Sequence, residues 1–367
     1  MVVLPEENGN AAERLRASGI KVIQVPLHRP RKSLRPGPHI DLVLGFREEI
    51  RTLRHIIREQ RADVVQVFGP IYPHGALAAR LEGVPVVWQL LSQFSPLPLR
   101  CLTMPAVVYL SDVVMTTGTT IARAHPGVTA LSRHLLPFYP PVDTDEFRAD
   151  PNRRLSARQE LHIPPEGILV GTVGNFNRQK GHDLLIKVAA RLLERNPRVY
   201  FRILGASTAS QFHYYERNVK GVAARLGLLK DERLKFVEPE SRVAELLPAF
   251  DIFALTSRWE GVPTTVLEAM ACGIPVVSLK VGAIHEVVEE GVTGHVVESR
   301  KVEAIETAIL HLLHNPGTRS AMGALARIRA VERYDTAACV ETHLAAYELA
   351  RHRHLPGFGR QRMSPAS

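Results

Sequence analysis

The chain has little cysteine and no long apolar run. Its 367 residues include only three cysteines, Cys101, Cys272 and Cys339, and these form no C-x-x-C pair. Sparse, scattered cysteine argues against a disulfide framework and a structural zinc site, and favours a reducing compartment. No apolar run reaches the roughly 18 residues that a membrane-spanning helix needs. The opening residues MVVLPEENGN lack the basic and apolar regions of a secretory signal. We therefore expect a cytoplasmic protein.

Aromatic residues are also scarce, at 6% of the chain, whereas the net charge is +9. A basic surface suits nucleic acid, an anionic membrane or an anionic small substrate. The basic residues are scattered, as in His28–Arg35 and Arg351–Arg362, with little aromatic interleaving, and no motif of a nucleic-acid-binding module is present. Each basic cluster also fits an ordinary solvated surface. The composition therefore argues against nucleic acid as a partner.

The alternation of apolar segments predicts the fold class. The chain is too long for one ordinary hydrophobic core, so two domains are expected. Between the first two predicted strands, Phe46–Gln60 carries apolar side chains at spacings of three and four, the helical period. Strands that alternate with such helices predict α/β domains with parallel sheets. The predicted strands of the first half are Lys21–Val25, Asp63–Phe68, Pro85–Gln89 and Asp112–Thr116.

The pattern restarts after Pro137–Arg154, a segment rich in proline and charge that we interpret as a linker. Helical patterns fill Val302–His314 and the region around Thr318–His352. The predicted strands of the second half are Ile168–Val173, Tyr200–Leu204, Leu234–Val237, Asp251–Thr256 and Ile274–Ser278.

These boundaries predict four parts of the chain. They are an N-terminal domain over residues 1–145, a C-terminal domain over residues 146–335, a helix over residues 336–354 that returns toward the first domain, and a disordered basic tail over residues 355–367.

Asp143 and Asp145 form a D-x-D pair within the expected linker. Such a pair can hold a divalent metal that grips a diphosphate. Here it lies beside prolines and away from the end of any predicted strand. A turn with a helix cap is the favoured interpretation. No metal site is predicted.

A strand–loop–helix unit in the second half has the geometry of an anion site. The strand Ile168–Val173 is followed by Gly174, a polar loop, and a helix that begins near His182. This geometry directs free backbone N–H groups at an anion. Arg178 and Lys180 add two cations that suit a diphosphate, although an ordinary charged surface loop is an equally simple interpretation. The loop has neither the G-x-G-x-x-G nor the Walker pattern, so no standard dinucleotide or P-loop site is predicted.

Ser257–Val277 reads SRWEGVPTTVLEAMACGIPVV and holds two glutamates, Glu260 and Glu268. Glu260 falls in a turn, and Pro263 suits the first position of the helix that follows. Glu268 lies one helical turn after Thr264, with its side chain directed back toward that turn. Acids near a helix start are favoured by charge alone, but carboxylates also accept hydrogen bonds from ribose and sugar hydroxyls. Beside a phosphate-type loop, the two acids indicate a nucleotide-sugar.

Together with Val281–Val297 (VGAIHEVVEEGVTGHVV), these motifs resemble the retaining group 1 glycosyltransferases of family 4. The resemblance is strong over residues 160–300 and weaker over residues 40–150. It implies a GT-B fold, in which two Rossmann-like domains face each other across the cleft that holds the active site. It also implies sugar transfer from a nucleotide-diphosphate-sugar to a glycan, lipid-linked or other hydroxyl acceptor, with retention of anomeric configuration, as in the synthesis of cell-envelope polysaccharide.

The resemblance implies roles by position. Glu260 would contact the transferred sugar, and Glu268 would bind the ribose hydroxyls. Lys180, supported by Arg178, would neutralise the diphosphate leaving group in place of a metal. The nucleotide-sugar would be a substrate, so no cofactor is implied. The other donor-binding positions would be Gly174, Asn175, Gly261, Val262, Pro263, Thr264 and Thr265.

Two positions depart from the family pattern. The family usually has an arginine where this chain has Asn175, and many members have a histidine just after the strand matching Pro85–Gln89. Gln89 or Ser92 would contact the sugar in place of that histidine. Two alternatives to a transferase therefore stay open: a catalytically silent protein that binds a nucleotide-sugar or a partner, and a GT-B nucleotide-sugar epimerase.

The beginning of the chain also departs from the family, whose members open with a strand and a glycine-rich loop. Val2–Leu27 resembles instead the second strand, a short helix and the third strand. We therefore expect a first domain that lacks its first strand. The basic surface also suits an acceptor at an anionic membrane, so peripheral association at the inner face of the membrane is expected.

Overall fold

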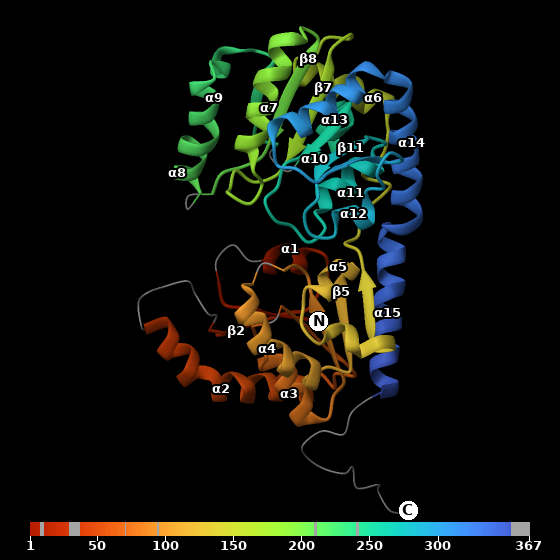
Figure 1. Cartoon of the computed structure of the whole chain (residues 1–367). Coiled ribbons are helices and arrows are strands. Elements are labelled where there is room, and N and C mark those ends of the chain that lie inside the picture. Colours follow the sequence, from red (N-terminus) through yellow and green to blue (C-terminus); the bar gives the residue numbers. More distant parts are fainter. Residues whose placement is uncertain are drawn as a thin grey trace, which may run out of the picture.

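The computed structural model describes residues 1–7, 11–28, 37–69, 71–93, 95–208, 211–239 and 242–353. These residues form two Rossmann-like α/β domains, one above the other in Figure 1, each with parallel strands. The tail predicted over residues 355–367 lies outside the described residues. In the part of the chain that the structure describes, no helix combines the length and the apolar character needed to cross a membrane.

The C-terminal domain is built on a six-stranded parallel sheet in the order β12-β11-β10-β7-β8-β9. After β7, the next strand β8 pairs with one side of β7. The chain later returns to β7, and β10 pairs with its other side. At such a switch point, the loops after the two strands part and leave room for a ligand. The strands are β7 (Ile168–Val173), β8 (Val199–Leu204), β9 (Leu234–Val237), β10 (Ile252–Leu255), β11 (Val276–Leu279) and β12 (Gly294–Val297).

The helices of this domain follow their apolar periodicity. Helix α7 (His182–Arg195) buries six apolar side chains at spacings of one, three and four, so that one face packs on the sheet. Helix α13 (Val302–His314) packs beside it. Between the strands run α8 (Phe212–Tyr214), the π-helix Tyr215–Lys220, α9 (Gly221–Arg225), α10 (Val243–Leu246), α11 (Thr264–Ala271) and α12 (Ile284–Val287).

The N-terminal domain contains a four-stranded parallel sheet in the order β3-β4-β5-β6. The two central strands are buried along their whole length, as expected for a parallel sheet covered on both faces. β1 (Val2–Pro5) and β2 (Val22–Val25) pair with each other in a separate two-stranded sheet. The sheet strands are β3 (Val65–Phe68), β4 (Val86–Leu90), β5 (Val113–Thr117) and β6 (Leu135–Phe138), and the helices are α1 (Ala12–Ala17), α2 (Gly37–Glu59), α3 (His74–Glu82), α4 (Leu97–Leu110) and α5 (Thr119–Arg123).

The linker is shorter than predicted, because both of its ends belong to regular structure. Its first residues, Pro137 and Phe138, are the end of β6, which is an edge strand where proline is tolerated. Its last residues start α6 (Pro151–Glu160). Asp150 caps this helix by accepting hydrogen bonds from two backbone N–H groups.

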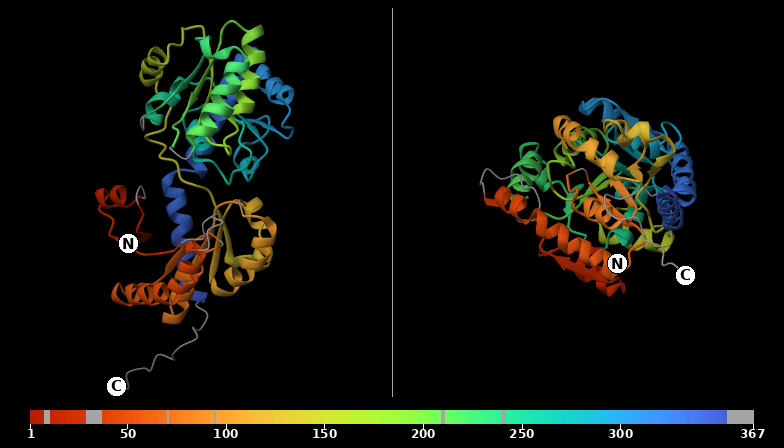
Figure 2. Two further views of the ribbon diagram at one scale, coloured as in Figure 1. Left: turned by 90° about the vertical axis from the view of Figure 1, so that its left-hand side faces the viewer. Right: turned by 90° about the horizontal axis from the view of Figure 1, so that it is seen from below.

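The helical region predicted around Thr318–His352 is two helices, α14 (Pro316–Arg333) and α15 (Thr336–Arg353). The break falls where the linker crosses. Val142 N donates to Tyr334 O at 2.8 Å, and Thr144 Oγ1 donates to Asp335 Oδ2 at 2.6 Å. These contacts with a distant segment replace the helical hydrogen bonds at this point. Figure 2 shows α14–α15 and the linker passing together between the domains.

Helix α15 returns to the N-terminal domain and packs on β4, β5 and β6 (Figure 1). Small residues allow the close approach, since Ala346 and Ala350 are fully buried there. They share a core with Val87, Val113, Met115 and Phe138 of the sheet. Helix α15 is therefore part of the core of the first domain.

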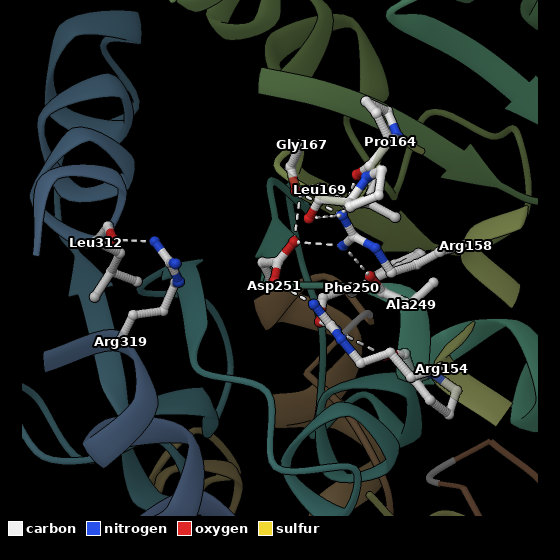
Figure 3. A network of polar contacts seen from close by, with 12 residues as sticks. Arg154, Arg158, Pro164, Gly167, Leu169, Ala249, Phe250, Asp251, Leu312 and Arg319 are labelled. Carbon is white, nitrogen blue, oxygen red and sulfur yellow. Dashed lines mark hydrogen bonds and ion pairs between the residues drawn. The ribbon is translucent and has the colours of Figure 1, made fainter. Parts of the chain in front are cut away.

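Helix α6 is anchored by Asp251, just before β10 (Figure 3). The carboxylate of Asp251 binds Arg154 at 2.6 Å and Arg158 at 3.1 Å. The same carboxylate accepts the N–H of Leu169 at 2.7 Å, and Arg158 donates to Gly167 O at 2.6 Å. This network fixes α6 at the amino ends of β7 and β10. The opposite ends of the same two strands carry the predicted site loops.

Candidate active site

The loops after β7 and β10 form one unit, because the two strands are neighbours. Thr256 Oγ1 donates to Gly181 O at 3.0 Å, and Arg258 N donates to Gln179 O at 2.7 Å. The predicted anion loop and the segment with the two glutamates therefore lie against each other. Only the fold brings these segments together, since about 80 residues separate them in the chain.

Arg258 clamps the two loops and was missed by the sequence analysis. Its guanidinium donates to Arg178 O at 2.8 Å and to Asp183 Oδ2 at 2.7 Å. Asp183 lies in the first turn of α7. The ion pair therefore ties the β10 loop to the start of the helix that follows the β7 loop. A single arginine in a turn gives no sequence signal for such a contact.

Glu260 is the best-buried acid of the site, with 7% of its surface exposed. Lys180 Nζ lies 2.9 Å from Glu260 Oε1, and Gln179 Nε2 donates to Oε2 at 3.1 Å. Both carboxylate oxygens are thus bound by consecutive residues of the β7 loop. A buried charge needs such partners, since an unpaired one is strongly destabilising. Gln179 is a site residue that the sequence analysis did not identify.

Glu268 lies on α11, half-buried, and its carboxylate forms no hydrogen bond with the described residues. Burial, and after it the charge of Glu146, raise its pKa, whereas the charge of Lys180 lowers it; the net result is a pKa of about 7. Lys180 is therefore electrostatically coupled to both predicted acids. The carboxylate of Glu268 is available to a ligand.

Helix α11 begins one residue later than predicted. Pro263 is extended, with φ −73° and ψ 125°, and is the N-cap rather than the first helical residue. Val262 and Pro263 are buried, whereas Thr264 is exposed. The hydroxyl of Thr265 is buried and has no hydrogen-bond partner among the described residues. The first N–H groups of a helix have no partner within it, so this start can bind an anion.

Gly261 meets the N-terminal domain. A Cβ at this position would lie 2.2 Å from the carbonyl oxygen of Leu91, which follows β4. Only glycine allows this approach. The loop after β10 and the end of a first-domain strand are thus in direct contact, and Ser92 is adjacent.

Gln89 does not lie at the site, contrary to the expectation. It is 2% exposed, and its Nε2 lies 2.6 Å from Nε2 of His343 on α15. Side chains alternate between the faces of a strand, so Gln89 shares the α15-covered face with Val87. The sequence could not show which face α15 covers. Ser92 stays a prediction.

His182 holds the beginning of the β7 loop. It is fully buried, and its Nε2 lies 3.1 Å from Gly174 O and 3.3 Å from Asn175 O. Burial lowers the pKa of His182 to about 4, so the ring is neutral and carries its proton on the nitrogen that donates to these carbonyls. Asn175 and Arg178 are exposed, and their side chains form no hydrogen bond with the described residues.

Asp143 forms the predicted turn. Its Oδ1 accepts the N–H groups of Asp145 at 3.0 Å and Glu146 at 2.9 Å. Across the described ranges, no group of three or more His, Cys, Asp and Glu side chains is arranged to hold a metal ion.

Comparison with protein families identifies the second half of the chain. Residues 154–329 match the sequence model of the family described as glycosyl transferases group 1. The chain carries a group 1 glycosyltransferase domain. The matched residues include both loops of the candidate site and both glutamates, Glu260 and Glu268.

Curated relatives of this glycosyltransferase domain act on different substrates. A D-inositol 3-phosphate glycosyltransferase of Kribbella flavida is 31% identical over 262 residues, which cover 69% of this chain and 60% of that protein. A GDP-mannose-dependent alpha-(1-6)-phosphatidylinositol monomannoside mannosyltransferase of Mycolicibacterium smegmatis is 33% identical over 219 residues, which cover 57% of this chain and 54% of that protein. The chain spans between about half and 60% of the length of these relatives.

Solved structures extend the likeness to both domains. HepE of Anabaena, in complex with UDP, aligns with a TM-score of 0.77 at 20% identity and covers 94% of this chain and 90% of that one. Sucrose-phosphate synthase of Thermosynechococcus elongatus aligns with a TM-score of 0.71 at 18% identity, covering 95% and 98%. At such identities the likeness concerns the fold. The predicted GT-B fold is confirmed.

Proposed function

We propose that this protein transfers a sugar from a nucleotide-diphosphate-sugar to a hydroxyl acceptor. The observation that carries the proposal is the arrangement around Glu260. A buried carboxylate held by Gln179 and Lys180 lies in the loop that leads to the start of α11, within a group 1 glycosyltransferase domain. A diphosphate suits the cation and the helix start, and hydroxyls suit the two acids. The UDP in HepE and the GDP-mannose named for the mycobacterial relative support this class of donor.

In this proposal, each site residue acts on a different part of the donor. Glu268 accepts hydrogen bonds from the ribose, and Glu260 contacts the sugar. Negative charge develops on the diphosphate as the glycosidic bond breaks, and Lys180 and the N–H groups of Thr264 and Thr265 stabilise it. Retention of configuration and independence of a metal are part of the proposal, on the strength of the family resemblance and of these fixed positive groups.

We further propose that the acceptor is reached at an anionic membrane surface through α4. The exposed stripe of this helix is apolar at spacings of three and four. Leu102 is 77% exposed and Tyr109 is 62% exposed. Between residues 83 and 142 the only acid is Asp112, which is buried, whereas Arg123 and Arg133 are exposed. Exposed apolar side chains, in a stretch of chain that has exposed cations and no exposed acid, suit the interface of anionic lipids. The other exposed residues of the stripe are Leu97, Pro98, Cys101, Pro105 and Ala106.

Incubation with a panel of labelled UDP-, GDP- and ADP-sugars tests the proposed reaction. The expected result is release of the nucleoside diphosphate together with sugar transfer to an added glycan or lipid acceptor, in the presence of EDTA as well as in its absence. Binding without turnover would favour the silent alternative. Conversion of the donor into its epimer would favour the epimerase. Full loss of transfer in EDTA, restored by magnesium or manganese, would contradict the metal-independent proposal.

A further inference from the structure

A carboxylate of the C-terminal domain caps a helix of the N-terminal domain. Glu286 on α12 accepts the N–H of Thr119 at 2.8 Å and the N–H of Thr120 at 2.7 Å, one on each oxygen. These residues begin α5, where the helix supplies no partner for its own N–H groups. The hydroxyl of Tyr139 also donates to Glu286, at 3.1 Å. Figure 1 shows α12 and α5 facing each other across the domain boundary.

The carboxylate is ionised in this position. Burial alone would raise the pKa of Glu286, but the hydrogen bonds from Thr120, Thr119 and Tyr139 hold it below its ordinary value. Hydrogen bonds to a charged acceptor are stronger than those between neutral groups. A glutamine could accept with only one of its two terminal atoms, so it could not replace both bonds to α5.

The segment that carries Glu286 also supports the loop after β10, which contains Glu260 and Gly261. Ala283 N donates to Gly261 O at 2.9 Å. A Cβ at Gly282 would lie 2.4 Å from Glu260 O and 2.5 Å from Gly261 O. There is no free space between the loop of the candidate site and the start of α12. A displacement of Glu286 relative to the loop would break these contacts.

The same segment is fixed at the point where the chain crosses between the domains. Arg329 donates to the backbone oxygen of Glu286 at 3.0 Å. Tyr334, beside that arginine, packs edge-on against Tyr139 of the linker, with ring centroids 5.3 Å apart. The backbone of Glu286 is therefore held by its own domain, and its side chain is held by the other domain.

We propose that Glu286 is a positioning residue that fixes the N-terminal domain relative to the loop after β10. An acceptor held by the first domain is then presented to the sugar held near Glu260. This role rests on the proposed transfer reaction. It differs from a role in donor binding, because Glu286 contacts protein backbone in the other domain. The positioning role concerns transfer to an acceptor, which needs the two domains correctly aligned, and does not concern binding of the donor.

The test compares Glu286→Gln and Glu286→Ala with Glu290→Gln in the full chain. Glu290 is a matched control on the same segment, since it pairs at 2.8 Å with His295 of its own domain. We expect kcat for transfer to fall about 10- to 100-fold in both Glu286 variants, as loss of charged hydrogen bonds predicts. The donor Kd, measured by calorimetry, should change less than about threefold, within the context dependence of such contacts. The control should match the wild type in kcat and in donor Kd.

A second measurement is independent of activity. Hydrogen exchange of the peptide that contains Thr119 and Thr120 should become faster in both Glu286 variants, because their N–H groups lose their acceptor. Thr119→Pro removes one of these N–H groups at a first helical position, which tolerates proline, and its loss of kcat should not add to that of Glu286→Gln. Unchanged exchange in the Glu286 variants would overturn the cap in solution. Faster exchange with unchanged kcat would overturn the positioning role. If exchange is faster in the Glu286 variants, but the wild type binds the donor without transferring the sugar, the proposed function is contradicted instead.

Discussion

Lys180 Nζ lies 2.9 Å from Glu260 Oε1, in an ion pair whose side chains are 18% and 6% exposed. The two residues come from the loops after neighbouring strands β7 and β10. In the proposed reaction, Lys180 has two anionic partners, the carboxylate of Glu260 and the diphosphate of the donor. The pair therefore sets the position of the cation before the donor arrives, and the cost of ordering the lysine side chain is met during folding.

Lys180→Ala should lower turnover more than donor affinity. The lysine charge acts most strongly on the charge that develops as the leaving group departs, so we expect kcat to fall by about 100-fold or more. Steady-state kinetics and calorimetric donor binding measure the two effects. Lys187→Ala is a suitable control, because Lys187 is exposed on α7, the helix that follows the loop. An unchanged kcat in Lys180→Ala would rule out the role in leaving-group stabilisation.

Glu268→Ala should weaken donor binding. Hydrogen bonds to a charged group contribute about 1.5–3 kcal/mol, which corresponds to roughly ten- to hundredfold in Kd. Calorimetry with the free nucleoside diphosphate and with the nucleoside measures this loss. The loss should appear with both ligands, since both contain the ribose. Equal affinity in mutant and wild type would remove the ribose assignment.

The same residue predicts an unusual pH dependence. Its pKa rises from 4.5 in the unfolded chain to about 7 in the folded protein. Between these values the folded protein binds more protons than the unfolded chain, so the contribution of Glu268 to stability is present below pH 4.5 and is lost as the pH rises through 7. We expect a fall in the Tm of the wild type between pH 5 and 8 that is smaller in Glu268→Gln.

Donor affinity should change in the opposite direction. The ribose hydroxyls need an ionised acceptor, so donor binding should strengthen as the pH rises through about 7. Affinity that is independent of pH from 6 to 8 in the wild type would contradict either the raised pKa or the contact with the ribose. Glu268→Gln distinguishes these two explanations, because it keeps a hydrogen-bonding side chain and loses the titration.

The fold was predictable where both faces of a strand are buried. The bounds of the interior strand β7 are the predicted ones, because an interior parallel strand reads as a nearly continuous apolar run. The bounds of β9 also agree, although β9 is an edge strand and mostly half-buried. The strand β6 was missed since its sequence, LLPF, contains a proline and is short. The helix predicted over residues 336–354 starts where α15 starts. The cause of the break could not be read from the sequence, because contacts with the linker, rather than a glycine or proline, end α14 at Arg333.

The placement of the candidate-site residues was predictable where local geometry decides it. The β7 loop, Glu260 and the start of α11 follow from strand–loop–helix patterns in a short stretch. Gln179 and Arg258 were missed, because their partners lie about 80 residues away in the chain. Glu286 was missed for the same reason, since its acceptor role depends on how one domain sits on the other.

Leu102→Glu should weaken binding to anionic vesicles. The substitution places a charge in the centre of the apolar stripe of α4, where 77% of the leucine is exposed and folding should be little affected. Co-sedimentation with phosphatidylglycerol vesicles, compared with phosphatidylcholine vesicles, measures the loss. Leu155→Glu is the matched control, because Leu155 is 61% exposed on α6 of the other domain. Equal vesicle binding by both variants would contradict docking through α4.

Arg178 and Asn175 allow the departure from the family pattern to be tested. The family usually has an arginine at the position of Asn175, and we propose that Arg178, three residues later in the same loop, supplies that charge. Both side chains are exposed and unbonded to the described residues, so substitutions at either position should leave the fold intact. Arg178→Ala should lower kcat by about tenfold or more, the effect of losing one charged hydrogen bond to the leaving group.

The double variant Asn175→Arg with Arg178→Ala should recover most of that loss, because the charge returns from the position that the family uses. Asn175→Lys with Arg178→Ala is the comparison, since lysine restores the charge without the two-pronged geometry that suits a phosphate. Steady-state kinetics of the wild type, Arg178→Ala and the two double variants measure the loss of kcat and its recovery. If Arg178→Ala retains full activity, the arginine does not replace the missing one, and Lys180 with the start of α11 stabilises the leaving group without it. If the loss is not recovered by Asn175→Arg, Arg178 acts from a position that residue 175 does not reach.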